Sequence, residues 1–138
     1  ERYAKLLDLP VAIIHKTRLS GAEVSVQRIV GDVRDKQVLI VDDMISTGGT
    51  IEKAIKALLE AGCLSSGIKV AASHGLLVGP AAERLGKLPI ERIHVSDSVP
   101  RPEQFSVPIQ VSSLERLLGE TIQRLHASES IAGLISRQ

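Results

Sequence analysis

Residues 38–50 read VLIVDDMISTGGT, and this stretch decides the fold. Its first four residues are apolar without alternation, a pattern typical of a strand buried on both faces in a parallel sheet covered by helices. Two adjacent carboxylates, Asp42 and Asp43, follow at the predicted strand end. Ligands of open parallel sheets bind beyond the carboxyl ends of the strands. Because neighbouring carboxylates repel each other, we expect a ligand to bridge or neutralise this pair.

A loop of small and hydroxyl-bearing residues separates the acids from the next helical pattern. Gly48 and Gly49 allow backbone N–H groups to turn toward one point, and Ser46, Thr47 and Thr50 add hydroxyl donors. The N-terminus of the following helix contributes roughly half a positive charge. These features predict a phosphate-binding loop. The loop contains no lysine, so it is not the nucleotide-binding P-loop, whose pattern requires Gly-Lys-Ser/Thr.

The acid pair indicates what the rest of the ligand is. Carboxylates accept hydrogen bonds from vicinal sugar hydroxyls, and they can hold a divalent cation through water. A phosphate site beside such a pair fits a sugar phosphate such as ribose 5-phosphate. The alternative is an ordinary strand–turn–helix connection in which Asp and Gly serve as turn formers. The residues alone leave both interpretations open.

Short apolar runs alternate with helical patterns along the chain, which predicts one α/β domain with a mostly parallel sheet flanked by helices. The runs predicted to form strands are residues 11–15, 38–41, 68–73 and 91–96, with a weaker one at 108–112. Residues 24–31 alternate less cleanly. Because the turn-like sequence GDVRDK follows, we expect them to run antiparallel into residues 38–41 as an edge hairpin.

The strongest helix prediction covers residues 51–61. Apolar residues recur there at i, i+3, i+4, i+7 and i+8, and Gly62 ends the pattern. A shorter helix is predicted over residues 80–85, with Pro80 in its first turn. Residues 1–10 read as the end of a helix that has no start signal, which suggests a processed or truncated chain.

A last helix is predicted to begin near Ser112 or Ser113. Ser112 and Glu115 have the spacing of a capping box. Apolar residues at helical spacing are expected to form a stripe that faces the core: Leu114, Leu117, Leu118, Ile122 and Leu125.

Composition excludes several classes of function. The 138 residues carry a net charge of only +1 and include one Tyr and one Phe, so neither nucleic acid nor a membrane surface is an expected partner. The apolar runs are too short to span a bilayer, and no signal peptide is visible. Cys63 is the only cysteine, which excludes an internal disulfide and fits a reducing compartment. A cytoplasmic protein is predicted.

VLIVDDMISTGGT resembles the phosphoribosyl-pyrophosphate (PRPP) binding motif of type I phosphoribosyltransferase folds. Further motifs narrow the resemblance: HKTR at residues 15–18, IVGDVRDK at 29–36, SHGLLVGPA at 73–81, VSDSVP at 95–100, and H-x-x-E-S-I-x-x-L-I near the end. Together they are similar to the ribose-phosphate pyrophosphokinase (PRPP synthetase) family along essentially the whole chain.

This resemblance implies transfer of the diphosphoryl group of ATP to the C1 hydroxyl of ribose 5-phosphate, with Mg2+, in a homo-oligomer. By resemblance, Asp42 and Asp43 hold the ribose hydroxyls, and residues 46–50 surround the 5-phosphate. Lys16 and Arg18 match a basic pair on a flexible catalytic loop, where they would stabilise charge during phosphoryl transfer. From the residues alone, a solvated surface loop is the alternative for these two side chains.

The chain departs from the family in two ways. Ser46 stands where the family commonly has Asp, which we interpret as tolerated variation. The family's enzymes have two such domains, with the ATP-binding residues largely in the N-terminal half. Residues 1–138 are therefore predicted to be the C-terminal, ribose-5-phosphate/PRPP-binding domain, with the N-terminal half absent and little or no turnover on its own.

Two other functions stay open. A phosphoribosyltransferase would consume PRPP, and the shared loop does not separate it from a synthetase; HKTR, SHGLLVGP and VSDSVP favour the synthetase. A non-catalytic, PRPP-binding regulatory protein would not need Lys16 and Arg18. His74 and Asp97, each at a predicted strand end, are second candidates for the cleft. His74 is equally a capped strand-end histidine, and Asp97 equally an Asx turn.

Overall fold

The computed structural model describes residues 2–18, 25–100 and 105–135. In chain order its helices and strands are α1 (Arg2–Leu7), β1 (Ile13–Arg18), β2 (Ser25–Val30), β3 (Leu39–Ile45), α2 (Gly49–Glu60), β4 (Ile68–Gly75), α3 (Ala81–Gly86), β5 (Ile90–Ser96), β6 (Ile109–Ser112), α4 (Glu115–His126) and α5 (Ala132–Ile135).

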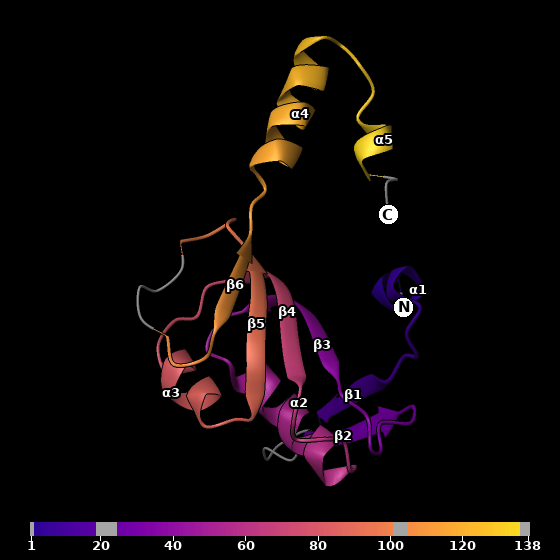
Figure 1. Cartoon of the computed structure of the whole chain (residues 1–138), viewed down its shortest axis with the longest axis vertical. Helices are drawn as coiled ribbons and strands as arrows, with labels where there is room; N and C mark the ends of the chain where they lie inside the picture. Colours follow the sequence, from indigo (N-terminus) through magenta and orange to yellow (C-terminus); the bar gives the residue numbers. More distant parts are fainter. Residues whose placement is uncertain (1, 19–24, 101–104, 136–138) are drawn as a thin grey trace.

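A four-stranded sheet in the order β3-β4-β5-β6 forms the centre of the fold (Figure 1). All of its neighbouring strands are parallel, with Ile40 opposite Val70 and Val70 opposite Ile93. The predicted α/β fold with a mostly parallel sheet is confirmed. Because the strands are parallel, their carboxyl ends meet at one edge of the sheet, where loops after different strands can form one site.

The hairpin is present, but its partner strand differs from the prediction. β2 pairs antiparallel with β1 in a separate two-stranded sheet, with Ile13 opposite Val30. The strand predicted over residues 11–15 therefore belongs to this hairpin and not to the parallel sheet. The GDVRDK segment does not turn β2 onto β3, because Asp35 N–H donates to the Gly62 carbonyl at the end of α2 (2.9 Å).

The core lies between the parallel sheet and the two helices α2 and α3. α2 buries Ile51, Ala54, Ile55 and Leu58, as its periodicity predicted. Gly62 ends the helix region in a left-handed conformation (φ 90°), with its N–H on the Leu59 carbonyl.

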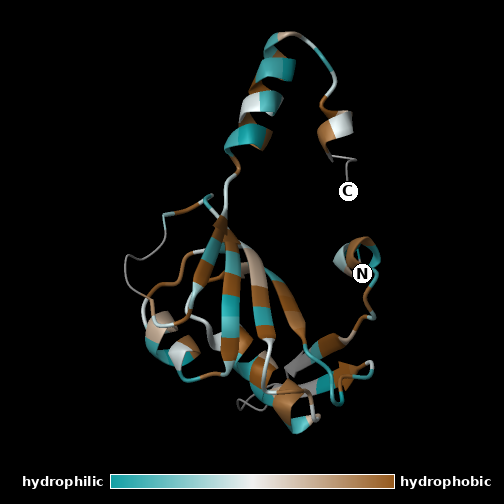
Figure 2. Ribbon diagram, viewed as in Figure 1, coloured by the Kyte–Doolittle hydropathy of each residue, from teal (hydrophilic) through white to brown (hydrophobic). Residues whose placement is uncertain are grey.

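The prediction that β3 is buried on both faces is wrong. This strand is hydrophobic over most of its length (Figure 2). Leu39 and Val41 nevertheless leave 39% and 44% of their surface exposed, because α2 and α3 both pack on the opposite face. A continuous apolar run therefore overestimated how far this strand is covered.

The prediction that α4 turns its apolar stripe toward the core is wrong. Figure 1 shows α4 and α5 extending away from the sheet, and Leu118 and Ile122 are exposed at 56% and 67%. Helical periodicity shows that a helix has an apolar face but does not say what that face packs against. None of the described helices combines the length and the apolar character needed to cross a membrane.

Matched substitutions in α2 and α4 test this difference in burial. Ile55 is 0% exposed and belongs to the core, whereas Ile122 is 67% exposed. Ile55→Ala is expected to lower the free energy of unfolding by about 2–5 kcal/mol, because it leaves a cavity. Ile122→Ala is expected to change it by less than about 0.5 kcal/mol. Urea denaturation measures both values; an equal loss for the two variants would show that α4 is packed.

Candidate functional site

The acid pair lies within β3, which continues through Asp42 and Asp43 to Ile45. Asp43 N–H donates to Oδ1 of Asp42 (3.0 Å), and both side chains are left accessible to a ligand. The two residues line one cavity of about 290 Å3 together with the loop that follows them. That cavity brings together the predicted acid pair and phosphate loop; its lining is Asp42, Asp43, Met44, Ile45, Ser46, Thr47, Gly48, Gly49, Thr50 and Ile51.

The turn into α2 is made by Gly48. It has a left-handed backbone (φ 75°, ψ −2°) and occupies the N-cap of α2. A Cβ at this position would lie 2.9 Å from Cγ of Leu85, which is fully buried in α3. Glycine is therefore required both by the backbone conformation and by the close packing of α3 under the loop.

Lys16 and Arg18 lie on β1 and not in a loop. Their backbones pair with Gln27 and Ser25 of β2. The predicted catalytic loop runs from Lys16 to Glu23, and its residues from 19 onward lie outside the described part of the chain. The catalytic role of Lys16 and Arg18 stays a prediction.

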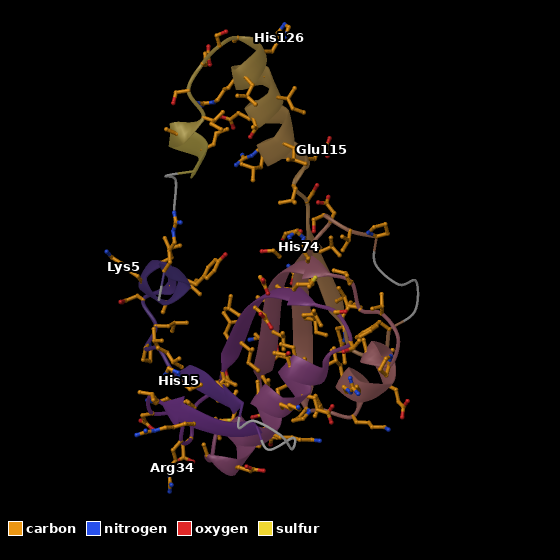
Figure 3. All side chains as sticks on the ribbon, turned by 180° about the vertical axis from the view of Figure 1, so that it is seen from behind. Lys5, His15, Arg34, His74, Glu115 and His126 are labelled. Atoms are coloured by element: carbon orange, nitrogen blue, oxygen red, sulfur yellow. The ribbon has the colours of Figure 1, made fainter. Side chains whose placement is uncertain are left out.

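His74 ends up at the carboxyl edge of the sheet, on the strand next to the acid pair. It is opposite Met44 of β3 in register and lies at the end of the sheet from which the chain continues into α4 (Figure 3). Its ring nitrogen Nδ1 is 2.7 Å from the hydroxyl oxygen of Ser98. Ser98 thus fixes the ring, and a binding role for His74 stays a prediction.

Asp97 connects β5 to the start of α4. Its Oδ2 accepts the Ser113 hydroxyl (2.6 Å) and its Oδ1 accepts the Leu114 N–H (2.8 Å). The Ser113 hydroxyl in turn accepts a hydrogen bond from the Glu115 N–H (3.1 Å). The side chain that binds a backbone N–H at the start of α4 is therefore Ser113 and not Ser112. The Ser113 hydroxyl and the Leu114 N–H lower the pKa of the Asp97 carboxyl. The structure thus shows Asp97 as an anchor for the start of α4, and its role in the cleft stays a prediction.

Acid is expected to loosen the anchor of α4. A carboxyl whose pKa is lowered by folding stabilises the fold above its unfolded pKa, and this stabilisation is lost as the pH falls below roughly 4. The protection of the Leu114 and Glu115 amides against hydrogen exchange, taken relative to the intrinsic exchange rate at the same pH, should therefore fall between neutral and acidic pH. Asp97→Asn should show this low protection already at neutral pH and lose the pH dependence. An Asp97→Asn variant with wild-type exchange would contradict the anchor.

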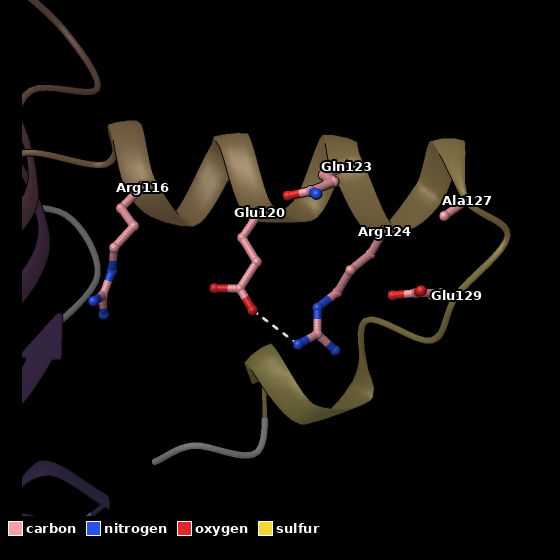
Figure 4. Close-up of a pocket in the computed structure, with 6 residues that line it drawn as sticks. All are labelled: Arg116, Glu120, Gln123, Arg124, Ala127 and Glu129. Carbon is pink, nitrogen blue, oxygen red and sulfur yellow. Dashed lines mark hydrogen bonds and ion pairs between the residues drawn. The ribbon is translucent and has the colours of Figure 1, made fainter.

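A second cavity, of about 490 Å3, lies along α4 and the first residues after it (Figure 4). Arg124 donates there to Glu120 (2.8 Å) and to the Ser130 carbonyl (3.1 Å). This polar cavity belongs to the helical extension, away from the acid pair. Among the residues that the structure describes, no group of three or more His, Cys, Asp or Glu side chains could hold a metal ion.

A comparison with protein families shows which family the chain belongs to. Residues 21–136 match the model of the phosphoribosyl synthetase-associated domain. The chain belongs to this family. The match covers the acid pair, the phosphate loop, His74 and Asp97, and it extends through α4.

Several relatives of this phosphoribosyl synthetase-associated domain are named ribose-phosphate pyrophosphokinase. The chain is 39% identical over 135 residues to the ribose-phosphate pyrophosphokinase of Caldanaerobacter subterraneus subsp. tengcongensis, which covers 97% of the chain and 42% of that protein. It is 40% identical over 133 residues to the ribose-phosphate pyrophosphokinase of Chlorobaculum tepidum, covering 96% and 41%. The chain therefore spans about two fifths of the length of these relatives.

A solved structure has the same fold as the phosphoribosyl synthetase-associated domain described above. The phosphoribosylpyrophosphate synthetase from Mycobacterium smegmatis superimposes with a TM-score of 0.80 at 37% identity, covering 93% of this chain and 41% of that one.

Sequence reasoning missed two residues that support the loop of this domain. Arg84 donates to the Thr47 carbonyl (3.0 Å), and Leu85 packs under Gly48. Both lie in α3, which the sequence predicted only as a short helix. An arginine next to a leucine in a six-residue helix does not indicate that the two side chains contact a loop 37 positions earlier in the sequence.

Proposed function

We propose that this chain is the C-terminal, ribose-5-phosphate-binding part of a ribose-phosphate pyrophosphokinase. The observation that carries the proposal is the single cavity over residues 42–51, which joins an acid pair to a phosphate loop. The similarity to relatives named ribose-phosphate pyrophosphokinase over nearly the whole chain supports it. The chain would then serve nucleotide biosynthesis as part of a longer enzyme.

In the proposed reaction, the C1 hydroxyl oxygen of ribose 5-phosphate attacks the β-phosphorus of ATP. The bond between that phosphorus and the α,β-bridging oxygen breaks, AMP leaves, the C1 hydroxyl proton is released, and PRPP forms. The loop N–H groups and hydroxyls of residues 46–50 bind the 5-phosphate. The carboxylates of Asp42 and Asp43 accept hydrogen bonds from the ribose hydroxyls and so orient C1 toward ATP. Lys16 and Arg18 stabilise charge on the transferred group.

The proposed enzyme uses Mg2+, which neutralises phosphate charge when bound. Mg2+ prefers oxygen ligands, keeps several waters, and is commonly held by one or two carboxylates together with substrate phosphates. Asp42 and Asp43, adjacent and accessible on β3, fit that requirement. They would hold the ion through water, with the remaining ligands coming from the substrates.

ATP, ribose 5-phosphate and further copies of the same chain are the partners we propose, and the cytoplasm is the proposed compartment. The lone cysteine supports a reducing compartment, and Cys63 is buried without a disulfide partner. Burial raises the pKa of its thiol, which keeps it in the unreactive protonated form.

A chimeric enzyme tests the proposed function. This chain would replace the matching segment of the Caldanaerobacter ribose-phosphate pyrophosphokinase, and AMP formation from ATP and ribose 5-phosphate with Mg2+ would be measured. The chimera is expected to form AMP and PRPP together. Lys16→Ala is expected to lower kcat by about 100-fold or more, the loss typical of removing one donor from a developing charge.

Lys53→Ala is the matched control, because Lys53 is an exposed lysine of α2; its kcat should be unchanged. A chimera that assembles and binds ATP but forms no AMP would contradict the synthetase. Consumption of PRPP would indicate a transferase, and binding without turnover a regulatory protein. Wild-type turnover of Lys16→Ala would remove that residue from the mechanism.

A further inference from the structure

The phosphate loop is held by hydrogen bonds to its carbonyl groups from the segment after β4. The Leu77 N–H donates to the Ile45 carbonyl and the Val78 N–H donates to the Ser46 carbonyl, each at 3.0 Å. Both donors belong to the SHGLLVGPA motif of residues 73–81. This motif therefore supports the loop through its backbone, apart from any binding role of His74.

Arg84 continues the series to a third consecutive carbonyl. Its Nη1 donates to the Thr47 carbonyl (3.0 Å), and its Nε pairs with Oε2 of Glu52 (2.9 Å). The planar guanidinium group can make both contacts at once because its donors have a fixed geometry. Arg84 thus links the loop to the first turn of α2, with about a third (34%) of its side chain exposed.

These contacts fix the direction of the loop N–H groups. In a planar trans peptide, the carbonyl of one residue and the N–H of the next point in opposite directions. Carbonyls 45 to 47 point toward the segment at residues 77–84, so the N–H groups of residues 46 to 48 point away from it. Within the part of the chain that the structure describes, the N–H groups of Thr47 and Gly48 have no hydrogen-bond acceptor.

Arg84 also acts on the charge beside the loop. Glu52 lies in the first turn of α2, where its carboxylate would repel a bound anion. Arg84 at 2.9 Å and Lys56 at 2.7 Å both pair with it. The hydrogen bond from Lys56, with the nearby charge of Arg84, lowers the pKa of the Glu52 carboxyl. Removing Arg84 would leave more of that negative charge facing the phosphate.

We propose that Arg84 is the positioning residue of the phosphate loop. Through the Thr47 carbonyl and Glu52, it holds the N–H groups of residues 46–48 in the orientation that binds the phosphate ester. The identity of that ester as ribose 5-phosphate rests on the proposed function. The orientation of the loop does not depend on it.

Two charge-neutralising variants of α3 test the proposal. Arg84→Gln removes the contact with the loop, whereas Lys87→Gln removes an exposed cation at the C-cap of α3 that pairs with Glu83 of that helix (2.6 Å). The measurements are the amide 1H–15N shifts of Thr47, Gly48 and Gly49 without ligand, the affinities for ribose 5-phosphate and inorganic phosphate by calorimetry, and the melting temperature.

Arg84→Gln is expected to shift the resonances of the three loop amides and to lower the affinity for both ligands about tenfold. This is the loss typical of one charge-assisted hydrogen bond. Lys87→Gln is expected to leave the amides in place and change the affinities less than about twofold. Arg84→Lys should restore part of the affinity for inorganic phosphate, because the charge returns without the double contact.

The outcomes separate this proposal from the proposed function. If Arg84→Gln shifts the loop amides and binds phosphate more weakly, the positioning role is upheld. If the unsubstituted chain at the same time binds ribose 5-phosphate no more tightly than phosphate, the proposed substrate is rejected. A lower melting temperature with unchanged loop amides and unchanged affinities would overturn the positioning role and leave Arg84 as a structural residue.

Discussion

Gly48→Ala is expected to weaken ribose 5-phosphate binding by more than tenfold and to destabilise the fold. Its left-handed φ of 75° costs an alanine about 1–2 kcal/mol. The new Cβ would also lie 2.9 Å from Cγ of the fully buried Leu85, and overpacking of this kind costs about 1–3 kcal/mol more. Since Leu85 has no room to move, the loop must shift, and its N–H groups then lose their common direction.

Gly79→Ala provides the matched control for this prediction. Gly79 also has a positive φ, of 58°, but a Cβ there would meet no atom within 4 Å. It therefore reports the backbone cost alone. Calorimetric titration and urea denaturation of both variants give the comparison. If Gly48→Ala were no more destabilised than Gly79→Ala and bound ribose 5-phosphate normally, α3 would not be packed against the loop as described.

Asp43→Asn is expected to separate recognition of the sugar from recognition of the phosphate. The substitution keeps the size of the side chain but removes a charged acceptor for the ribose hydroxyls. A lost hydrogen bond to a charged group corresponds to roughly a 10- to 100-fold increase in Kd. Affinity for inorganic phosphate should be unchanged or slightly higher, because one negative charge near the anion is gone.

Asp35→Asn is the control for Asp43→Asn. Asp35 is exposed and has a left-handed backbone (φ 56°), a conformation that asparagine tolerates well. Calorimetry with ribose 5-phosphate and with inorganic phosphate should show no change in this variant. Equal affinity of Asp43→Asn and wild type for ribose 5-phosphate would exclude the Asp43 carboxylate from the sugar site.

The parts of the site that sequence could predict are local. The residues from Asp42 to Thr50 are consecutive, so their composition and the periodicity of α2 suffice to place an acid pair and a glycine turn before a helix. The cavity over residues 42–51 bears out their proximity. What the pattern left open was the orientation of the N–H groups in this loop.

The parts that it could not predict depend on distant contacts. Arg84 reaches the Thr47 carbonyl across 37 positions of sequence, and Asp97 anchors α4 through Ser113 and Leu114 across 16 and 17 positions. The stripe of α4 was recognised as apolar but assigned to the wrong environment. The hairpin was recognised too, yet the contact of Asp35 with the end of α2 decided its pairing.

The most direct test of the central claim is a calorimetric titration of this chain with ribose 5-phosphate, with inorganic phosphate and ribose as separate ligands. One saturable site is predicted, which binds ribose 5-phosphate more tightly than either fragment, because the acid pair and the loop each hold one end of the ligand. Equal affinities for ribose 5-phosphate and phosphate would contradict the role of the acid pair. No saturable binding of any of the three ligands would contradict the site itself.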